Sequence, residues 1–200
     1  GFAKRFGALS FGVAPVLAVQ MFRAEGLGGF GFPFLGFFPP GFIPTFSADP
    51  FNLSNNGTSM SYGGGVRAGV EWKIMPSLRV GVSGQTPLWM TPFSKYSGLF
   101  ANGGKFNIPA NITAGIAFDA LPTLTLMAEY KRIFYSGVPA IANSGASIIV
   151  PFVVPPGPGA LLGSANGPGF GWRDVNVFTV AGEWRVTPQL ALRAGYAHNT

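Results

Sequence analysis

The sequence predicts an all-β membrane protein, namely an antiparallel segment of a transmembrane β-barrel with about seven strands. Three features predict this class: the chain is poor in charge, it has no stretch suited to a membrane helix, and its apolar residues alternate along short segments. Only 10% of its 200 residues are charged, against about 25% in soluble domains. Mean hydropathy is +0.34. So few charges make a fully solvated surface hard to build.

Proline excludes a helical membrane protein. A membrane-spanning helix needs roughly 18 or more consecutive apolar residues. The best stretch, 146–162, contains Pro151, Pro155, Pro156 and Pro158, and proline breaks a helix interior. The other architecture that satisfies every backbone polar group in lipid is the closed β-barrel, whose alternating strands give a weak hydropathy signal.

Six segments alternate apolar and polar residues with a period of two, which is typical of a strand with two different faces. In 66–74, for example, Val70 and Trp72 share the apolar parity, while Glu71 and Lys73 share the polar parity. Every charged residue in the six segments falls on the polar parity. The other five segments are 78–86, 112–119, 124–131, 178–186 and 190–197.

A seventh strand is predicted over 9–22, although Pro15 interrupts its pattern. Short and long connections then alternate along the chain, which is typical of an outer-membrane barrel. A soluble β-sandwich is the alternative, but it rarely has three loops of more than about 20 residues at one end. The short connections are 75–77, 120–122 and 187–189, and the long ones are 26–62, 87–110 and 133–174.

Aromatic residues on the apolar parity indicate two interfacial girdles, as expected of a membrane barrel. The alternative is the ordinary enrichment of aromatic residues in strands. One predicted girdle lies near the short turns and the other near the long loops; their members are Trp72, Phe118 and Trp184, and Tyr130, Phe178 and Tyr196, respectively.

The composition disfavours an enzyme, a metal site and a cofactor. The chain has no Cys, and His198 is its only His, so a His-centred metal site or a nucleophilic triad has one candidate at most. The glycine run at 63–69 leads into an alternating strand instead of a helix, so it is not a phosphate loop. Net charge is +6, but the basic residues are scattered, which disfavours nucleic-acid binding.

Four stretches carry a resemblance to a known family. They are KYSGLFANGGKFNIPANITAGIAF (95–118), RIFYSGVPAIANSG (132–145), GPGFGWRDVNVFTVAGEW (167–184) and LRAGYAHN (192–199). Together they resemble the FadL-like outer-membrane transporters of long-chain fatty acids and aromatic hydrocarbons, and the similarity covers most of the chain beyond about residue 50. The family's loop motif often carries acids where this chain has Asn102, Lys105 and Asn107, which leaves ligand preference open.

The resemblance implies a fourteen-stranded barrel, plugged by an N-terminal hatch, in the bacterial outer membrane. Residues 1–200 would then form a partial barrel that contains the fifth to eleventh strands and lacks the hatch and the terminal strands. The full-length protein would be a monomer that contacts outer-membrane lipid. It would transport hydrophobic small molecules passively, without a cofactor; the alternative is a general diffusion porin or a structural barrel. An outer-membrane lipase would need a Ser–His pair that the sequence does not place.

The stretch GLGGFGFPFLGFFPPGFIPTF (26–46) reads as a loop, because its prolines and glycines suit neither a helix nor a strand. We expect its rings, together with apolar residues of 87–109, to capture an oily substrate. The alternative is that the rings pack among themselves and cap the barrel. The predicted capture residues are Phe30, Phe32, Phe34, Phe37, Phe38, Phe42, Phe46, Leu88, Trp89, Phe93 and Phe100.

Four basic residues on the polar parity are predicted to point into the lumen. The resemblance implies that one or two of the four anchor a substrate carboxylate, since Arg and Lys bind carboxylates through charge-assisted hydrogen bonds. The four residues are Arg67, Arg79, Lys131 and Arg193. The alternative is that they pair with Glu71, Glu129 and Glu183 and fill the interior.

Overall fold

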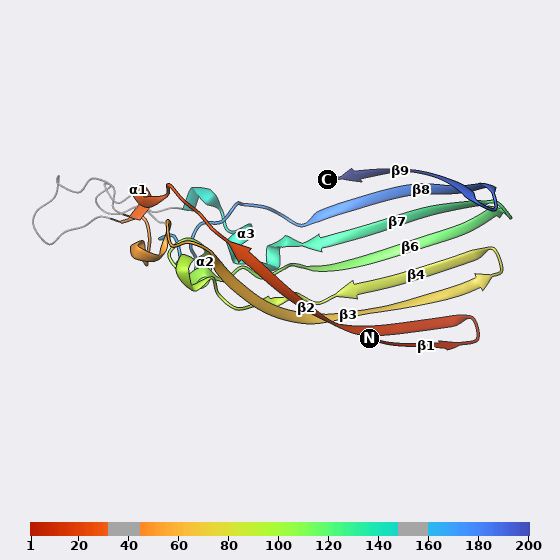
Figure 1. Cartoon of the computed structure of the whole chain (residues 1–200), viewed down its shortest axis with the longest axis horizontal. Helices are drawn as coiled ribbons and strands as arrows, with labels where there is room; N and C mark the ends of the chain where they lie inside the picture. The colour runs from red at the N-terminus through yellow and green to blue at the C-terminus, as the bar shows by residue number, and fades with distance from the viewer. Residues whose placement is uncertain (32–44, 148–159) are drawn as a thin grey trace, which may run out of the picture.

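One antiparallel sheet makes up most of the computed structural model, which describes residues 1–31, 45–147 and 160–200. Its order is β1-β2-β3-β4-β6-β7-β8-β9, with the short β5 beside β3, so the chain meanders from one edge to the other (Figure 1). The strands are β1 (Phe2–Phe6), β2 (Leu9–Phe22), β3 (Ser59–Met75), β4 (Leu78–Gln85), β5 (Trp89–Met90), β6 (Ala110–Leu121), β7 (Leu124–Phe134), β8 (Val175–Thr187) and β9 (Leu190–Asn199).

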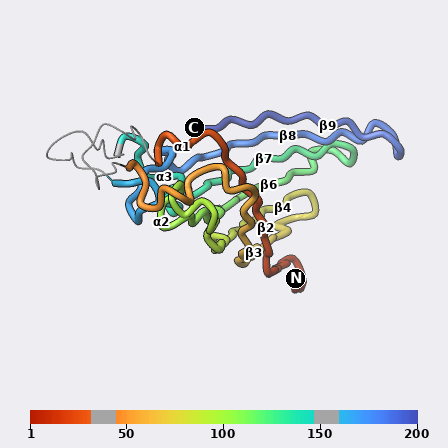
Figure 2. Tube along the Cα trace, turned by 60° about the vertical axis from the view of Figure 1, so that its left-hand side comes forward, coloured from red at the N-terminus to blue at the C-terminus, as the bar shows by residue number. Residues whose placement is uncertain are grey.

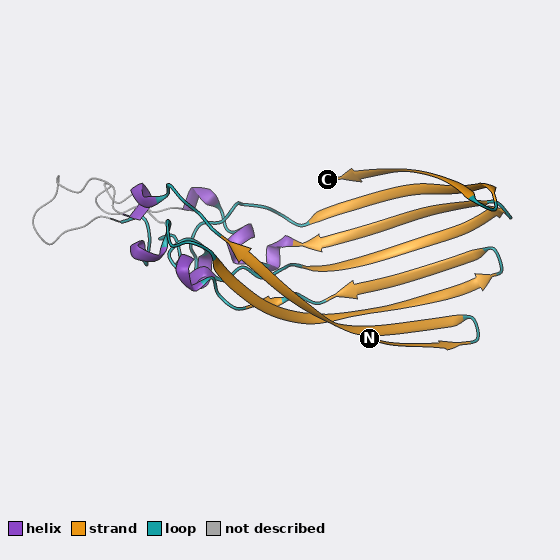
Figure 3. Ribbon diagram, in the orientation of Figure 1, coloured by secondary structure: helices purple, strands orange, loops and turns teal. Residues whose placement is uncertain are grey.

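Short turns lie at one end of the sheet and three long loops at the other, and the views in Figures 1 and 2 agree on this arrangement. We call them the first (23–58), second (86–109) and third (135–174) long loops. The short helices all lie at the long-loop end (Figure 3). They are α1 (Gly28–Gly31), α2 (Ala101–Gly104), α3 (Pro139–Ala142), and the 3₁₀ turns η1 (Pro50–Asn52), η2 (Ser94–Tyr96), η3 (Tyr135–Gly137) and η4 (Gly145–Ser147).

The predicted fold class is confirmed, and each of the seven predicted strands is present. Strand β3 begins at Ser59 instead of Val66, because its glycine-rich first half pairs with β2. The sequence prediction missed β1 and β5, which are too short for an alternation to stand out. Among the described residues no helix is long and apolar enough to cross a membrane.

The register confirms the predicted segregation of the two faces. Cross-strand partners point to the same side of a sheet. Val70 pairs with Val82, and Val80 pairs with Ile116, whereas Glu71 pairs with Gly81. The apolar and polar parities therefore form opposite faces, as predicted. We call the apolar one the outer face and the polar one the inner face.

The inner face is concave. It contains a hollow of about 580 Å³ whose lining includes Gly81, Gly115, Glu71, Arg79 and Glu129. On the outer face, by contrast, the side chains of Leu17 and Met21 are 89% and 72% exposed. Large apolar side chains gain about 1.5–3 kcal/mol each on leaving water. The outer face therefore suits contact with lipid.

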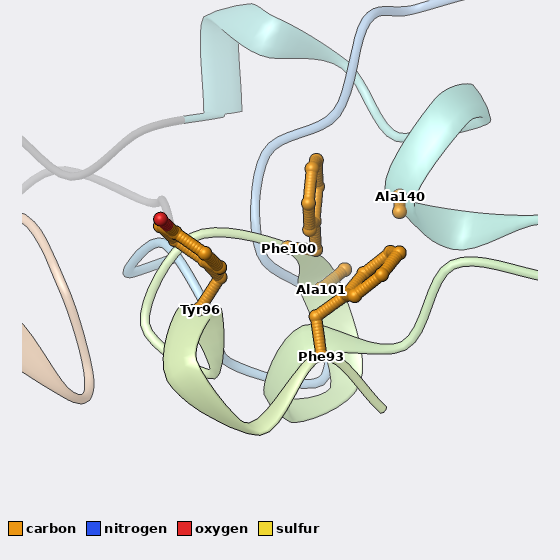
Figure 4. Close-up of a cluster of buried hydrophobic side chains, with 5 residues drawn as sticks. All are labelled: Phe93, Tyr96, Phe100, Ala101 and Ala140. Atoms are coloured by element: carbon orange, nitrogen blue, oxygen red, sulfur yellow. The ribbon is translucent and has the colours of Figure 1, made fainter. Parts of the chain in front are cut away.

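The buried core lies in the long loops, not on the sheet. Phe93, Tyr96, Phe100 and Ala101 of the second loop pack with Ala140 of α3, and we call this cluster the loop core. Figure 4 shows Phe93 and Phe100 projecting toward α3 and Ala140, while the ring of Tyr96 projects to the other side. The loop core holds the three loops in place above the end of the sheet.

Candidate functional site

An apolar pocket of about 280 Å³ lies where the three long loops meet. We call it the loop pocket. Each of the three loops contributes side chains to it, and none of the lining residues carries a polar side chain. They are Leu27, Phe30 and Leu53 from the first loop, Leu99 and Phe100 from the second, and Ala140, Gly145, Leu162, Pro168, Gly169 and Phe170 from the third.

Two hydrogen bonds to side chains fix the part of the first loop that lines the pocket. The N–H of Gly26 donates to Asn55 Oδ1 at 3.1 Å, and the N–H of Leu27 donates to Ser54 Oγ at 3.0 Å. These bonds fix the start of α1, which carries Phe30. The Phe30 ring lies edge-on to Phe46, with centroids 6.1 Å apart, and this packing orients Phe30 beside the pocket.

The second loop contributes Phe100, which joins the pocket to the loop core. Its ring centroid lies 4.9 Å from that of Phe22, at the end of β2, and 5.0 Å from that of Phe106. Both pairs are edge-to-face, which is the arrangement that the ring quadrupole favours. One side of Phe100 is therefore fixed by aromatic packing, while the other lines the pocket.

Main-chain hydrogen bonds attach the third loop to the second. Asn102 has φ 57° and Gly103 has φ 68°, and this left-handed turn directs their N–H groups to the carbonyls of Ser164 and Gly163 at 3.0 and 2.8 Å. Gly163 has φ +79°, and a Cβ there would lie 2.3 Å from the Ser97 carbonyl oxygen. A side chain at Gly163 would force the two loops apart.

The first and third loops are also joined by main chain. The N–H of Leu162 donates to the Phe46 carbonyl at 2.7 Å, and the N–H of Ala48 donates to the Leu162 carbonyl at 2.9 Å. Within the third loop, the N–H of Phe170 donates to the Ile141 carbonyl at 3.0 Å. Phe170 remains 61% exposed, so it leaves the pocket accessible from solvent.

Two carboxylates secure the loops. Asp49 accepts from Ser97 Oγ at 2.5 Å and from Asn52 Nδ2 at 2.9 Å, and these hydrogen bonds, Ser97 first, lower the pKa of Asp49. Asp174 accepts the N–H of Ser136 at 3.0 Å and a guanidinium N–H of Arg132 at 3.1 Å. Hydrogen bonding from Ser136, followed by Arg132, lowers the pKa of Asp174. Both acids are thus ionised at neutral pH. Asp49 joins the first loop to the second, and Asp174 joins the two ends of the third loop.

The structure divides the predicted capture residues into several groups. Phe30 and Phe100 line the loop pocket, and Phe46 packs on Phe30. Phe93 is buried in the loop core, and Leu88 is buried as well. Five of the predicted residues lie outside the described residues: Phe32, Phe34, Phe37, Phe38 and Phe42.

Trp89 does not line the loop pocket. It pairs with Gly64, which pairs with Leu17 of β2, so its side chain shares the outer face with Leu17 and is 56% exposed. The close approach of β5 to β3 requires glycine, since a Cβ on Gly63 would lie 2.2 Å from the Trp89 carbonyl oxygen. Trp89 therefore belongs to the aromatic residues of the outer face.

The sequence analysis did not predict that side chains of the third loop line the pocket. Leu162, Pro168 and Phe170 were not among the predicted residues, although the motif that contains Phe170 carried the resemblance. Nothing in a loop without periodicity indicates which side chains converge. The useful signal was the clustering of Gly and Pro with aromatic residues in all three long loops.

The four predicted lumen cations lie on the inner face, but the structure does not bring all four together. Arg79 lies 3.6 Å from Asp119, and Arg193 lies 2.6 Å from Glu183. Arg67 donates to the neutral Gln85 Oε1 at 2.7 Å. Of the pairings with Glu71, Glu129 and Glu183 considered above, Arg193–Glu183 is present. Arg79 pairs with Asp119 instead.

Neither Arg67 nor Lys131 has an ion pair with any described residue, and Lys131 also has no side-chain hydrogen bond within the described residues to set beside the one from Arg67 to Gln85. Lys131 lies opposite Thr113 and Val177 on the inner face. Within 1–31, 45–147 and 160–200, no three His, Cys, Asp or Glu side chains come together as a metal site would require.

No family model and no curated protein matches the sequence. Solved structures do match. The toluene transporter TbuX of Ralstonia pickettii is 19% identical with a TM-score of 0.55, and the toluene transporter TodX of Pseudomonas putida is 18% identical with a TM-score of 0.58; each match covers 98% of this chain and 52% of that one. A FadL homologue of Pseudomonas aeruginosa is 15% identical with a TM-score of 0.53, over 98% of this chain and 47% of its own.

The chain has the fold of the FadL-like channels. It spans about half the length of these solved structures. The open sheet therefore corresponds to part of a FadL-like barrel, and the resemblance seen in the four sequence motifs is confirmed at the level of the fold.

Proposed function

We propose that this chain is part of an outer-membrane channel that admits hydrophobic compounds, with the loop pocket as its first binding site. The observation that carries the proposal is the pocket itself, which is apolar, open to solvent at Phe170 and built by all three long loops. The apolar outer face supports a place in the membrane. The FadL-like fold, shared with proteins described as toluene transporters, supports the type of cargo.

The size of the loop pocket favours a small cargo. An apolar cavity of about 150 Å³ holds benzene, and pockets for drug-sized ligands begin at about 300 Å³. At about 280 Å³, the loop pocket has room for one aromatic hydrocarbon or for part of an alkyl chain. We therefore place monoaromatic hydrocarbons first among its substrates, and the chain of a long fatty acid second.

Movement through the channel is passive in this proposal. A hydrophobic solute leaves water for the loop pocket because apolar burial is favourable, and it continues down its concentration gradient along the inner face. No cofactor and no chemical step are needed. The full-length protein acts as a monomer surrounded by outer-membrane lipid.

A transport assay separates this function from that of a general diffusion porin. Liposomes that contain the full-length protein should take up dilute toluene faster than empty liposomes, while sugars should cause little swelling. Replacing Phe30 or Phe170 with Ser should slow toluene uptake, whereas Phe2→Ser, on the outer face far from the pocket, should not. Rapid swelling in sugars together with unchanged toluene uptake in both pocket variants would identify a porin instead.

A further inference from the structure

Basic residues gather at the end of the inner face that is farthest from the loop pocket. The last three rows of inner-face residues before the short turns hold four cations and two carboxylates. We call this group the short-turn cluster; its members are Lys73, Arg79, Asp119, Glu183, Arg185 and Arg193.

Polar side chains of the cluster, together with Thr125, lie on neighbouring strands across the sheet. Arg79 Nη2 lies 3.6 Å from Asp119 Oδ1, which also accepts from Thr125 Oγ1 at 2.7 Å. Thr125 lies directly opposite Glu183, and Glu183 lies directly opposite Arg193. Five neighbouring strands, β4, β6, β7, β8 and β9, therefore contribute to one band around the wall.

Two features show that the band carries more positive than negative charge. Lys73 lies directly opposite Arg79 across β3 and β4, and like charges in that arrangement repel. Arg185 and Arg193 share a single carboxylate, Glu183, through their Nε atoms at 3.1 and 2.6 Å. An arginine has five N–H donors, so each guanidinium keeps donors for a further acceptor.

The next row toward the loops does not supply that acceptor. It contains Arg5, Glu71 and Glu129. None of these acids lies within ion-pairing distance of the cluster in the part of the chain that the structure describes. The short-turn cluster, with four cations and two carboxylates, therefore keeps a formal excess of two positive charges.

We propose that the short-turn cluster binds the carboxylate of an amphiphilic solute at the exit of the channel. This inference rests on the proposed function and adds a second site to it. The loop pocket takes the apolar part of a solute on the long-loop side, and the short-turn cluster holds a charged head group before release on the opposite side. Lys73 and Arg185 are the new members of this site, alongside Arg79 and Arg193.

Binding of octanoate and octanol to the full-length protein in detergent tests this site, because the two probes share a chain length and differ in charge. Lys73→Gln and Lys73→Glu remove a cation that has no acidic partner among the described residues, so neither leaves a buried carboxylate behind. Arg185→Gln keeps Arg193 beside Glu183. Lys4→Gln is the matched control, since Lys4 lies opposite Phe11 on the outer face.

We expect the dissociation constant of octanoate to rise roughly threefold in Lys73→Gln and Arg185→Gln, and further in Lys73→Glu. Octanol binding should not change in any variant. Octanoate affinity that is unchanged in Lys73→Glu and Arg185→Gln, or equally weakened by Lys4→Gln, would overturn the site. If the unmodified protein did not bind octanol, that result would instead contradict the proposed function. The experiment therefore distinguishes a failure of the short-turn site from a failure of the proposed function.

Discussion

The hydroxyl of Tyr96 donates to the carbonyl of Gly57 at 2.6 Å, and this bond joins the second long loop to the end of the first. The same oxygen accepts the N–H of Ala24 at 3.0 Å, where the first loop leaves β2. Tyr96 is 0% exposed. A single side chain thus fixes both ends of the first loop above the sheet, and the walls of the loop pocket depend on it.

Tyr96→Phe should loosen the loops without unfolding the sheet. The substitution leaves the Ala24 N–H and the Gly57 carbonyl without this partner, at a cost of about 1–3 kcal/mol. We expect faster proteolysis of the long loops and weaker toluene binding. Tyr130→Phe, which removes a hydroxyl bonded to Asn176 on the outer face, is the control. Equal effects of the two substitutions would contradict this role of Tyr96.

Asp49 should make the loops sensitive to acid. Because the pKa of Asp49 is lowered in the folded protein, its stabilising effect is complete above the ordinary Asp range and is lost as pH falls through the lowered value. Asp49→Asn should therefore lower the thermal stability of the loops at pH 7. The difference from the unmodified protein should disappear in strong acid. A difference that stays constant with pH would show that Asp49 does not act through its charge.

Gly163→Ala should separate the second and third loops. Both Gly163 and Gly171 have positive φ, but only a Cβ at Gly163 would meet main chain, whereas a Cβ at Gly171 has no described neighbour within 4 Å. The left-handed conformation alone costs about 1–2 kcal/mol for alanine. We expect Gly171→Ala to lose that amount of stability, measured by denaturant unfolding, and Gly163→Ala to lose more. Equal losses would show that the close contact with Ser97 is readily relieved.

Arg67 should distinguish charged from neutral cargo. It donates to the neutral Gln85, so Arg67→Ala removes a cation from the inner face without leaving a carboxylate unpaired. Uptake of a fatty acid should fall more than uptake of toluene, because the acid alone needs a cationic partner. Parallel uptake measurements in cells that make the full-length protein provide the check. An equal loss for both substrates would assign Arg67 a structural role.

Much of the fold could be predicted from the alternation of apolar and polar residues along the strands. Charges such as Glu71 and Arg193 cannot face lipid, so their positions in the sequence indicate which side of six strands faces inward. The same argument could not find β1, since its five residues place Lys4 among the phenylalanines of the outer face, where the ammonium lies 4.7 Å from the centroid of the Phe6 ring. Lysine can keep its charge near water by extending along an apolar surface.

The candidate site was less predictable than the strands. Phe30 and Phe100 were expected to meet a substrate, and both line the loop pocket. Leu162 and Phe170 come from a loop with no repeat, and hydrogen bonds between main-chain groups bring them to the pocket. Trp89 was assigned to the capture surface because it lies among apolar loop residues, yet its pairing with Gly64 turns it to the outer face.

A crystal structure of the full-length protein soaked with bromobenzene would test the central claim most directly, because bromine gives an anomalous signal that locates the ring. The claim is that the loop pocket binds a small apolar compound before it enters the channel. We predict a bromine peak in the loop pocket, within contact distance of Phe30, Phe100 and Phe170. An empty loop pocket in crystals that hold bromobenzene elsewhere on the inner face would contradict it.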